Sequence, residues 1–408
     1  MIPYVYCILL TIMLSLLYWA GTQLKHDYKI WSIPGIVAIL AFTLNEGLRF
    51  GRGIDYNLYW QGYMDLARGW DSNQNIGFIR IEKFFLFFNL PYQALVLFMS
   101  MMFIIGTLFL MKRYKGVVMF ALPLWILMSR ATVDNMVRWY LAFSFVLIGL
   151  SFLLGSEKHS RLSYIICSLI GCTIHYAMLP IPLLFYLIYS FKKPLLSPTI
   201  AIIIFAIVAL LFESSMMLVL ADYVNALSQI SDHFSGYGEN AEFWLTNNAS
   251  GTDSTGLGIS NVFVFMFLII FGYKCCHKAG HNYVFAYNLF LIAAIFYTVG
   301  RRIELVGRFN WVFYFFGAIV FACIIRMTML RLIRYRAIVI ALTIMTLVFT
   351  IYKPLVSPFV NTPMKYMYVW DQKGETPQSM LQMYTTEKYK KNKNFETKKE
   401  RMKQYRSH

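Results

Sequence analysis

Apolar runs of roughly 17–25 residues follow one another along most of the chain, and each is long enough to cross a ~30 Å hydrocarbon core as a helix. Backbone polar groups in lipid need partners within the protein, so only helices and closed barrels can span a membrane. A barrel would show short strands of alternating polarity rather than long continuous runs. The sequence therefore predicts an all-α, polytopic integral membrane protein.

Composition supports this prediction. Hydrophobic residues make up 58% of the chain and charged residues only 14%, against about 25% charged in a typical soluble domain. Mean hydropathy is +0.55. We predict about twelve transmembrane helices from the spacing of the runs. They are expected near residues 2–21, 31–48, 90–111, 115–129, 138–155, 162–176, 177–191, 196–220, 259–273, 283–300, 309–326 and 336–352.

The basic residues predict the orientation. No basic residue precedes the first apolar run, whereas Lys25 and Lys29 follow it. The positive-inside rule then places the N-terminus outside and the first turn in the cytoplasm. The first run lacks the basic leader of a cleaved signal peptide, so it is expected to stay as a spanning helix. Alternate turns are rich in lysine, while the segments expected outside carry almost only arginine.

Two regions are expected. Residues 1–352 form a transmembrane domain with its active face outside, and residues 353–408 form a basic, mobile tail. An even number of crossings would place this tail outside, against the positive-inside rule, although long tails obey that rule less strictly. Alternatively, residues 354–370 re-enter the membrane. The positive charge of the tail would favour binding to an anionic lipid surface. Alternatively, the tail is solvated and has no specific role.

The first outer segment combines three glycines within seven residues, two arginines and an aspartate. Glycine lets backbone amides approach a ligand closely, and the guanidinium groups of Arg49 and Arg52 match phosphate oxygens. Asp55 follows and is the best carboxylate for a general base. A tyrosine stripe at helical spacing suits either sugar rings or the membrane interface. It consists of Tyr56, Tyr59 and Tyr63.

A second constellation precedes the fifth predicted helix. Arg130, Asp134 and Arg138 are spaced four residues apart, which places them within an arc of about 80° on a single helix. They form either an internal ion pair that neutralises charge or an anion site with one arginine to spare.

Two later outer segments complete the candidate residues. His175 lies where an apolar run must turn, and serves either as a hydrogen-bonding structural residue or as a proton shuttle or phosphate donor. Arg301, Glu304 and Arg308 fall within about 60° on one helix, with Arg302 beside them. This group is either a salt-bridged turn or part of an anion site.

Metal and nucleotide chemistry are not expected. Cys275, Cys276 and His277 with His281 have metal-ligand side chains, but adjacent cysteines rarely share a tetrahedral zinc and no second ligand pair exists. The cysteines in apolar spans do not form a disulfide framework. We expect no cofactor.

Together these motifs resemble the EpsG family. Gly53-Ile54-Asp55-Tyr56 with Tyr59 resembles its first-loop G-x-D-Y-x-x-Y motif, and Asp134 to Arg138 resembles its N-x-x-R segment. His175 is similar to the histidine that follows the sixth span of the family. Arg308 with Tyr314 resembles its late R-x-x-x-Y/F stretch. The likeness covers most of residues 30–325, and the long basic tail departs from it.

The resemblance implies a function. EpsG-like proteins are regarded as Wzy-type polymerases of exopolysaccharide, capsule or O-antigen in the bacterial cytoplasmic (inner) membrane. Their substrates are repeat units linked through pyrophosphate to undecaprenol, which serve as donor and acceptor. Membrane lipid, a chain-length regulator and a flippase are the other expected partners, and nucleic acid is not.

The expected roles follow from that chemistry. Asp55 is the preferred base and His175 the acceptor or phosphate contact, although these two roles could be exchanged. The arginines stabilise the departing pyrophosphate. The expected binding residues are Arg49, Arg52, Arg130, Asp134, Arg138, Arg301, Arg302, Glu304, Arg308, Tyr56 and Tyr59.

Three other functions fit the same residues. A lipid-linked oligosaccharide flippase would need arginines along a path through the bilayer. Another polyprenyl-dependent glycosyltransferase or acyltransferase could use Asp55. A non-catalytic scaffold would tolerate the loss of Asp55 and His175.

Overall fold

A computed structural model gives the fold of most of the chain. It describes residues 2–70, 74–135, 137–155, 159–213, 259–302, 304–333, 336–356, 367–377 and 379. Within these ranges the regular structure is helical and contains no strand. The chain divides into two compact units, which are described separately. Unit 1 comprises Met1–Leu110, Arg130–Leu179 and Tyr352–His408, and unit 2 comprises Met111–Ser129 and Pro180–Ile351.

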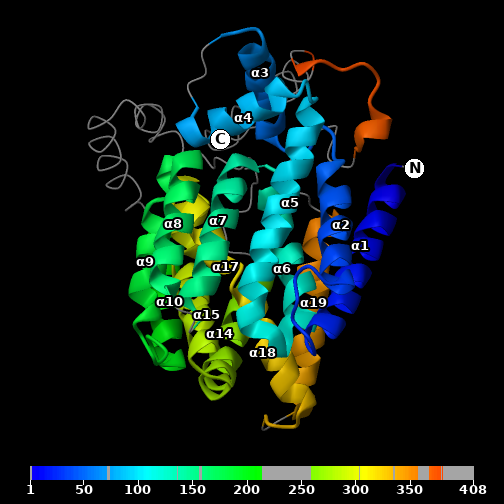
Figure 1. The fold of residues 1–408 in the computed structure, drawn as a ribbon. Helices are drawn as coiled ribbons and strands as arrows, with labels where there is room; N and C mark the ends of the chain where they lie inside the picture. The colour runs from blue at the N-terminus through cyan, green and yellow to red at the C-terminus, as the bar shows by residue number, and fades with distance from the viewer. Residues whose placement is uncertain are drawn as a thin grey trace, which may run out of the picture. The chain divides into compact units, whose positions relative to one another are not determined.

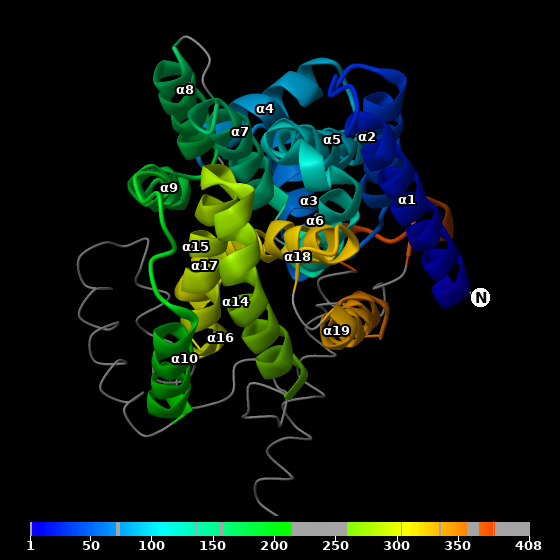
Figure 2. The ribbon, with the colours of Figure 1, turned by 90° about the horizontal axis from the view of Figure 1, so that it is seen from below.

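Unit 1 contains the N-terminal helices. They are α1 (Ile2–Leu24), α2 (Ile33–Gly47), α3 (Ile54–Ala67), α4 (Ile76–Phe87), α5 (Tyr92–Met111), α7 (Val137–Leu153) and α8 (Ser160–Ile174), with the short η2 (Tyr176–Met178) and η3 (Val369–Asp371). The end of α6 (Val118–Val133) also belongs to it. Helix α1 packs against α2 and α7 against α8, as Figure 2 shows from below. Helices α3 and α4 lie across the end where α2 finishes and α5 begins (Figure 1).

Close helix packing in unit 1 depends on small residues. A Cβ on Gly106 of α5 would lie 2.6 Å from the Ser144 carbonyl oxygen of α7, and one on Gly171 of α8 would lie 2.7 Å from the Ala142 carbonyl oxygen. Small residues at such contacts let membrane helices approach closely, where van der Waals packing holds them together. Helix α7 is therefore buried on nearly all sides and lacks a polar face.

Unit 2 contains η1 (Lys112–Val117), most of α6, α9 (Pro180–Tyr189), α10 (Pro198–Glu213), α14 (Ile259–Ala279), α15 (His281–Ile295), α16 (Tyr297–Arg302), α17 (Glu304–Tyr314), α18 (Gly317–Met329) and most of α19 (Arg336–Val356). Helix α14 packs against both α15 and α18. Aromatic rings fill the core of this unit, for example where Trp125 contacts Phe315 and Phe316 edge-on.

The outward faces of several helices are apolar. On α1 the exposed positions recur at helical spacing and include Tyr4, Ile8, Ile12 and Leu16. On α8 they include Leu162, Ile165, Ile166 and Leu169. Apolar surface of this extent marks an interaction face, and lipid suits a face that runs along a whole helix. The protein is thus a membrane protein, as its composition predicts.

The number of crossings stays a prediction. Four helical segments are long and apolar enough to span a membrane: Tyr4–Leu24, Tyr92–Arg130, Asn261–Ala279 and Val306–Met329. The other apolar helices within the described ranges are shorter. Each of the predicted segments nevertheless contains a helix, so the sequence located these elements correctly.

Candidate functional site

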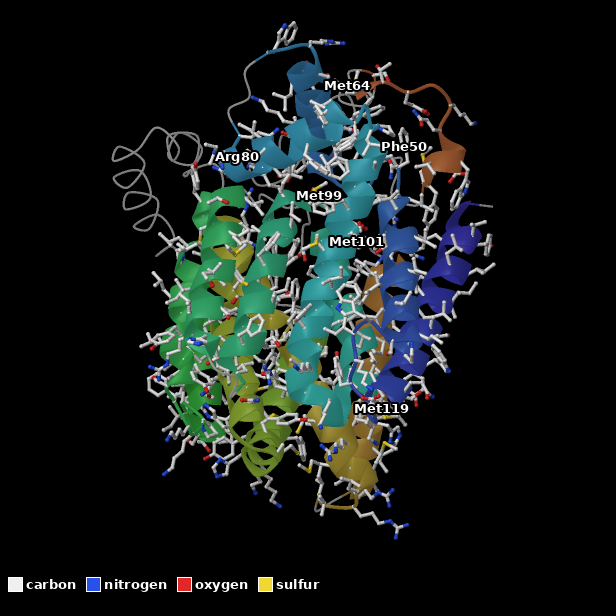
Figure 3. The ribbon with its side chains drawn as sticks, viewed as in Figure 1. Phe50, Met64, Arg80, Met99, Met101 and Met119 are labelled. Atoms are coloured by element: carbon white, nitrogen blue, oxygen red, sulfur yellow. The ribbon has the colours of Figure 1, made fainter. Side chains whose placement is uncertain are left out.

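Charged side chains gather at the end of unit 1 that carries α3 and α4. Figure 3 shows Phe50 at this end together with Met64 of α3 and Arg80 of α4. Glu46 lies in the last turn of α2, Arg49 and Arg52 lie in the loop that follows, and Arg130 lies in the last turn of α6. Asp134 lies in the turn between α6 and α7. We call Glu46, Arg49, Arg52, Arg130 and Asp134 the arginine cluster.

Ion pairs connect the members of the arginine cluster. Arg130 Nη1 lies 2.8 Å from Glu46 Oε1. Arg52 lies between the two carboxylates, 3.9 Å from Glu46 Oε2 and 3.9 Å from Asp134 Oδ2. Arg49 Nε lies 3.8 Å from Asp134 Oδ1. Residues from two separate segments of the chain, 46–52 and 130–134, therefore share one network.

Neutral groups surround the network. Asn45 accepts hydrogen bonds from both neighbours: its backbone oxygen from Arg52 at 3.2 Å, and its Oδ1 from Arg130 at 3.4 Å. Arg49 Nη1 donates to the Glu46 carbonyl oxygen at 2.6 Å. The Tyr6 ring of α1 packs on Arg130, with 4.7 Å between the guanidinium carbon and the ring centroid. These contacts hold the guanidinium groups in place before any ligand arrives.

The cluster is buried and has an excess of positive charge. Arg49, Arg52 and Arg130 are at most 2% exposed, and Glu46 is 1% exposed. Three guanidinium groups face two carboxylates, which leaves one positive charge if both acids are ionised. Burial by itself would raise the pKa of Asp134, but Arg52, Arg130 and Arg49 outweigh it and lower that pKa. Asp134 is therefore a carboxylate at neutral pH.

Several donors in the cluster have no hydrogen-bond acceptor among the described residues. They are Arg49 Nε and Nη2, Arg52 Nε and Nη1, and Arg130 Nε. Arginine has five N–H donors and no acceptor, and leaving buried donors unpaired is costly. An anionic ligand with several oxygens would satisfy these donors and neutralise the excess charge.

Gly53 joins the first loop to the turn between α6 and α7. Its φ is +91°, and a Cβ there would lie 2.3 Å from the Asp134 carbonyl oxygen and 2.8 Å from the Asn135 Cα. Only glycine fits both the dihedral angle and the space. The Asp55 amide N–H then donates to Asn135 Oδ1 at 3.3 Å. Two motifs that the sequence presents separately are thus in direct contact, with Asp55 in the first turn of α3.

Arg138 faces a different group of residues. Helix α6 ends at Val133 and α7 begins at Val137, so the single helix expected for Arg130, Asp134 and Arg138 is wrong. The Arg138 guanidinium carbon lies 5.6 Å from the Tyr59 ring centroid and 5.8 Å from that of Phe78. Arg138 also interacts electrostatically with Glu82 of α4. Burial raises the pKa of Glu82 to about 8, although Arg138 and a hydrogen bond with Gln74 oppose the shift.

His175 lies beside the start of α7. It follows the last residue of α8, and its ring packs edge-on against Trp139 with 4.9 Å between centroids. The start of α4 approaches the same place, since a Cβ on Gly77 would lie 2.6 Å from Thr173 Oγ1. His175 therefore neighbours Trp139, the residue that follows Arg138.

The tyrosine stripe divides between two faces. Tyr56 and Tyr63 point into the protein, where their hydroxyls donate to Gln93 Oε1 at 2.9 Å and to the Leu90 carbonyl oxygen at 2.7 Å. Both rings also contact Tyr92 of α5. Tyr59 instead contacts Phe78 and Arg138. A sugar platform made of all three rings is therefore not formed in this structure.

The late arginines belong to unit 2. Arg301 and Arg302 end α16, and Glu304 and Arg308 lie in α17, so Arg301 and Glu304 are not on one continuous helix as expected. A Cβ on Gly307 would lie 2.4 Å from the Gly300 carbonyl oxygen, which shows how closely the two helices pack. The side chains of residues 301–305 lie outside the described part of the chain.

Comparison with known proteins identifies the family. The model of the EpsG family matches residues 32–368, which is most of the chain. The chain belongs to the EpsG family. No curated protein and no solved structure gives a significant match. EpsG membership indicates a membrane protein of the polysaccharide polymerase type. It confirms the family suggested by the motifs around Asp55, Arg138, His175 and Arg308.

The EpsG match also includes the residues that border the cluster at its C-terminal side. It ends at Tyr368, and Tyr368 packs on Arg52 with 5.0 Å between the guanidinium carbon and the ring centroid. Sequence reasoning assigned no role to Tyr6, Glu46, Glu82 or Tyr368. An acid within an apolar helix was a usable indication for Glu46 and Glu82. The two tyrosines could not be found without the fold.

Metal ligands are not grouped anywhere in the described parts of this EpsG protein. No three His, Cys, Asp or Glu side chains among those residues are placed to hold a metal ion. Cys275 and Cys276 lie buried near the end of α14, and both have free thiols.

Proposed function

We propose that this EpsG-family protein polymerises oligosaccharide repeat units that are linked through pyrophosphate to undecaprenol. The growing chain is transferred from its lipid pyrophosphate to the end of the next lipid-linked unit. The reaction takes place at the outer face of the bacterial cytoplasmic membrane, in a protein with about twelve crossings. The observation that carries the proposal is the buried arginine cluster, several of whose donors have no acceptor in the part of the chain that the structure describes.

The arginine cluster suits the leaving group of this reaction. The acceptor hydroxyl oxygen bonds to the anomeric carbon, and the bond from that carbon to the pyrophosphate oxygen breaks. The bonding electrons leave with the pyrophosphate, so negative charge grows on its oxygens. Preplaced guanidinium groups stabilise that charge without reorganisation, and their effect is larger in a buried site of low dielectric constant. Arg49, Arg52 and Arg130 supply the free N–H groups.

Asp55 is our candidate for the base that accepts the hydroxyl proton. It lies three residues from Arg52 in the sequence and is only partly buried, so it is accessible to a substrate. Its position is fixed through Gly53 and Asn135. His175 is the alternative base, or else a contact to the acceptor or phosphate. Neither role requires a metal or a nucleotide.

Arg138 is proposed to complete the binding of the glycan-bearing end of the substrate. It is flanked by the Tyr59 and Phe78 rings, and aromatic faces of this kind suit sugar rings. The roles of Arg301, Arg302, Glu304 and Arg308, which belong to unit 2, remain predictions from the sequence. The lipid tail would lie against the apolar helix faces.

The test is glycan length in a strain that lacks its own copy of this gene. Wild type is compared with Arg52→Lys, Arg130→Lys, Asp55→Asn and His175→Ala, with membrane levels measured by immunoblot. Arg68→Lys is the matched control, because Arg68 is half exposed and its contacts among the described residues are an ion pair with Asp65 at 3.6 Å and the Trp70 ring.

We expect long chains in wild type and Arg68→Lys, and a single lipid-linked unit outside the membrane in the cluster and Asp55 variants. Accumulation of that unit on the cytoplasmic side would instead support transport. Long chains in every variant would contradict the assigned roles and favour a scaffold.

A further inference from the structure

The segment after α19 returns to the arginine cluster. Within unit 1, Tyr368 forms an isolated antiparallel bridge with Arg49. The Phe50 amide donates to the Met367 carbonyl oxygen at 3.1 Å, and the Val369 amide donates to the Leu48 carbonyl oxygen at 3.0 Å. Figure 1 shows this segment, in orange-red, at the end of unit 1 that carries α3 and α4. Residues 367–371 of the basic tail are therefore part of the folded unit.

Tyr368 is held in one position by contacts on both sides. Its ring packs on Arg52, and on the other side it stacks on Trp370 with 4.7 Å between centroids and 11° between planes. Its amide donates to Asp371 Oδ2 at 3.0 Å, which closes the turn of η3. Tyr368 is 1% exposed. Trp370 is exposed and covers it.

The hydroxyl of Tyr368 points into the cluster. Its electrostatic neighbours are Arg52, Arg130, Glu46 and Tyr6. Burial raises the pKa of Tyr368, although Arg52 and Arg130 partly oppose the shift, so the phenol is neutral and can donate. The hydroxyl has no hydrogen-bond partner among the described residues. The neighbouring guanidinium groups cannot accept its proton, because arginine has only donors. Among the described residues, the Glu46 carboxylate oxygens do not accept a hydrogen bond from it either.

We propose that the Tyr368 hydroxyl donates a hydrogen bond to the anion that occupies the arginine cluster. A phosphoryl oxygen among Arg49, Arg52 and Arg130 would supply the acceptor that the buried hydroxyl lacks. Residues 367–371 are then a wall of the binding site rather than part of a detached tail. The identity of this anion as a lipid pyrophosphate rests on the proposed function, whereas the contact itself does not.

The experiment measures binding by the purified full-length protein in detergent. Inorganic pyrophosphate and undecaprenyl pyrophosphate are titrated against wild type, Tyr368→Phe and Tyr114→Phe. Tyr368→Phe keeps the ring on Arg52 and removes only the hydroxyl. Tyr114→Phe is the matched control, because this buried tyrosine lies in unit 2 and already donates to the Asn282 carbonyl oxygen at 3.0 Å. The melting temperature of each ligand-free protein is measured in parallel.

Tyr368→Phe is expected to raise the dissociation constant of either probe roughly ten-fold, as for loss of a hydrogen bond to a charged group. Its melting temperature should not fall, since the hydroxyl has no hydrogen-bond partner among the described residues of the free protein. Tyr114→Phe should lower the melting temperature and leave binding unchanged. Equal affinity of Tyr368→Phe and wild type, or absence of binding of both probes to wild type, would overturn the proposal.

These results are separate from those for polymerisation. If the variants at Asp55 and the arginines still make long chains while Tyr368→Phe binds pyrophosphate weakly, the proposed function fails and the contact stands. If polymerisation depends on the arginines while Tyr368→Phe binds pyrophosphate as well as wild type does, the proposed function stands and the Tyr368 contact fails.

Discussion

At the scale of single residues, the site depends on Gly53 as much as on its charged neighbours. Gly53 has a backbone conformation that side chains rarely adopt, and its α-carbon lies against the backbone of Asp134 and Asn135. This contact fixes the position of Asp55 relative to Asp134 of the arginine cluster. A methyl group there would have to push the two segments apart.

Gly53→Ala is therefore expected to destabilise the protein by more than the ~1–3 kcal/mol that a strained dihedral angle costs. It should also abolish polymerisation, because Asp134 and Asp55 lose their relative position. Thermal unfolding in detergent gives the first quantity and glycan length the second. Gly69→Ala is the control, since Gly69 has a φ of +82° but none of the described residues places an atom within 4 Å of an added Cβ. An equal loss of stability in the two variants would show that the contact is unimportant.

Glu82 gives a prediction about pH. The folded pKa is raised by burial to about 8 from an ordinary value of 4.5, so between these values the folded protein holds a proton that the unfolded chain releases. The neutral acid therefore contributes stability that is fully present below pH 4.5 and is lost as pH rises through about 8. Glu82→Gln, which stays neutral, should lack this loss.

The measurement is the melting temperature of Glu82→Gln and wild type from pH 5 to pH 8.5. The melting temperature of Glu82→Gln relative to that of wild type should rise steadily across this range. Asp27→Asn serves as control, because the Asp27 side chain is 69% exposed. A constant difference between Glu82→Gln and wild type at all pH values would contradict a buried neutral Glu82.

At the scale of helices, the hydrophobic runs located the elements well because each run is long and continuous. The ends were less predictable. The run near residues 309–326 is divided between α17 and α18, and the helix assumed for Arg130 to Arg138 ends at Val133. Turns of this kind depend on tertiary contacts such as that of Gly53, which no local pattern shows.

For the candidate site, the sequence likewise indicated the individual charged residues but not their contacts with one another. Arg49, Arg52 and Asp134 stood out because charged residues beside apolar runs are functional by default. Their mutual contact and the burial of Tyr6 and Tyr368 beside them arise from segments far apart in the sequence. The paired roles of Tyr56 and Tyr63 in the core were likewise hidden, since a tyrosine stripe suits a core, an interface or a ligand equally.

The packing of α8 against α7 provides a prediction at this scale. Gly171→Val should displace α8, because even a Cβ would lie 2.7 Å from the Ala142 carbonyl oxygen. We expect a lower melting temperature and loss of long glycan chains, since His175 follows the end of α8. Ile170→Val is the control, because Ile170 is 41% exposed on the same helix. Wild-type stability in Gly171→Val would mean that the two helices are not closely packed in the membrane.

At the scale of the whole chain, two observations bear on the number of membrane crossings. They are the arrangement of basic residues and the contact of residues 367–369 with the loop of Arg49. The positive-inside rule predicts that the first turn is cytoplasmic and the loop of Arg49 is outside. The bridge between Arg49 and Tyr368 requires the start of the tail to lie on the side of that loop. Both conditions hold only if an even number of crossings separates the N-terminus from residue 367.

Labelling with a membrane-impermeant thiol reagent in intact spheroplasts tests this topology. Trp70→Cys and Lys373→Cys should both be labelled from outside, because Trp70 in the α3–α4 segment is 60% exposed and Lys373 is also exposed. Lys29→Cys, whose native side chain is 73% exposed, should be labelled only after permeabilisation. Wild type sets the background from its own free cysteines. Labelling of Trp70→Cys without Lys373→Cys would contradict both the even number of crossings and the place of Tyr368 in the site, because a tail on the cytoplasmic side cannot reach Arg49.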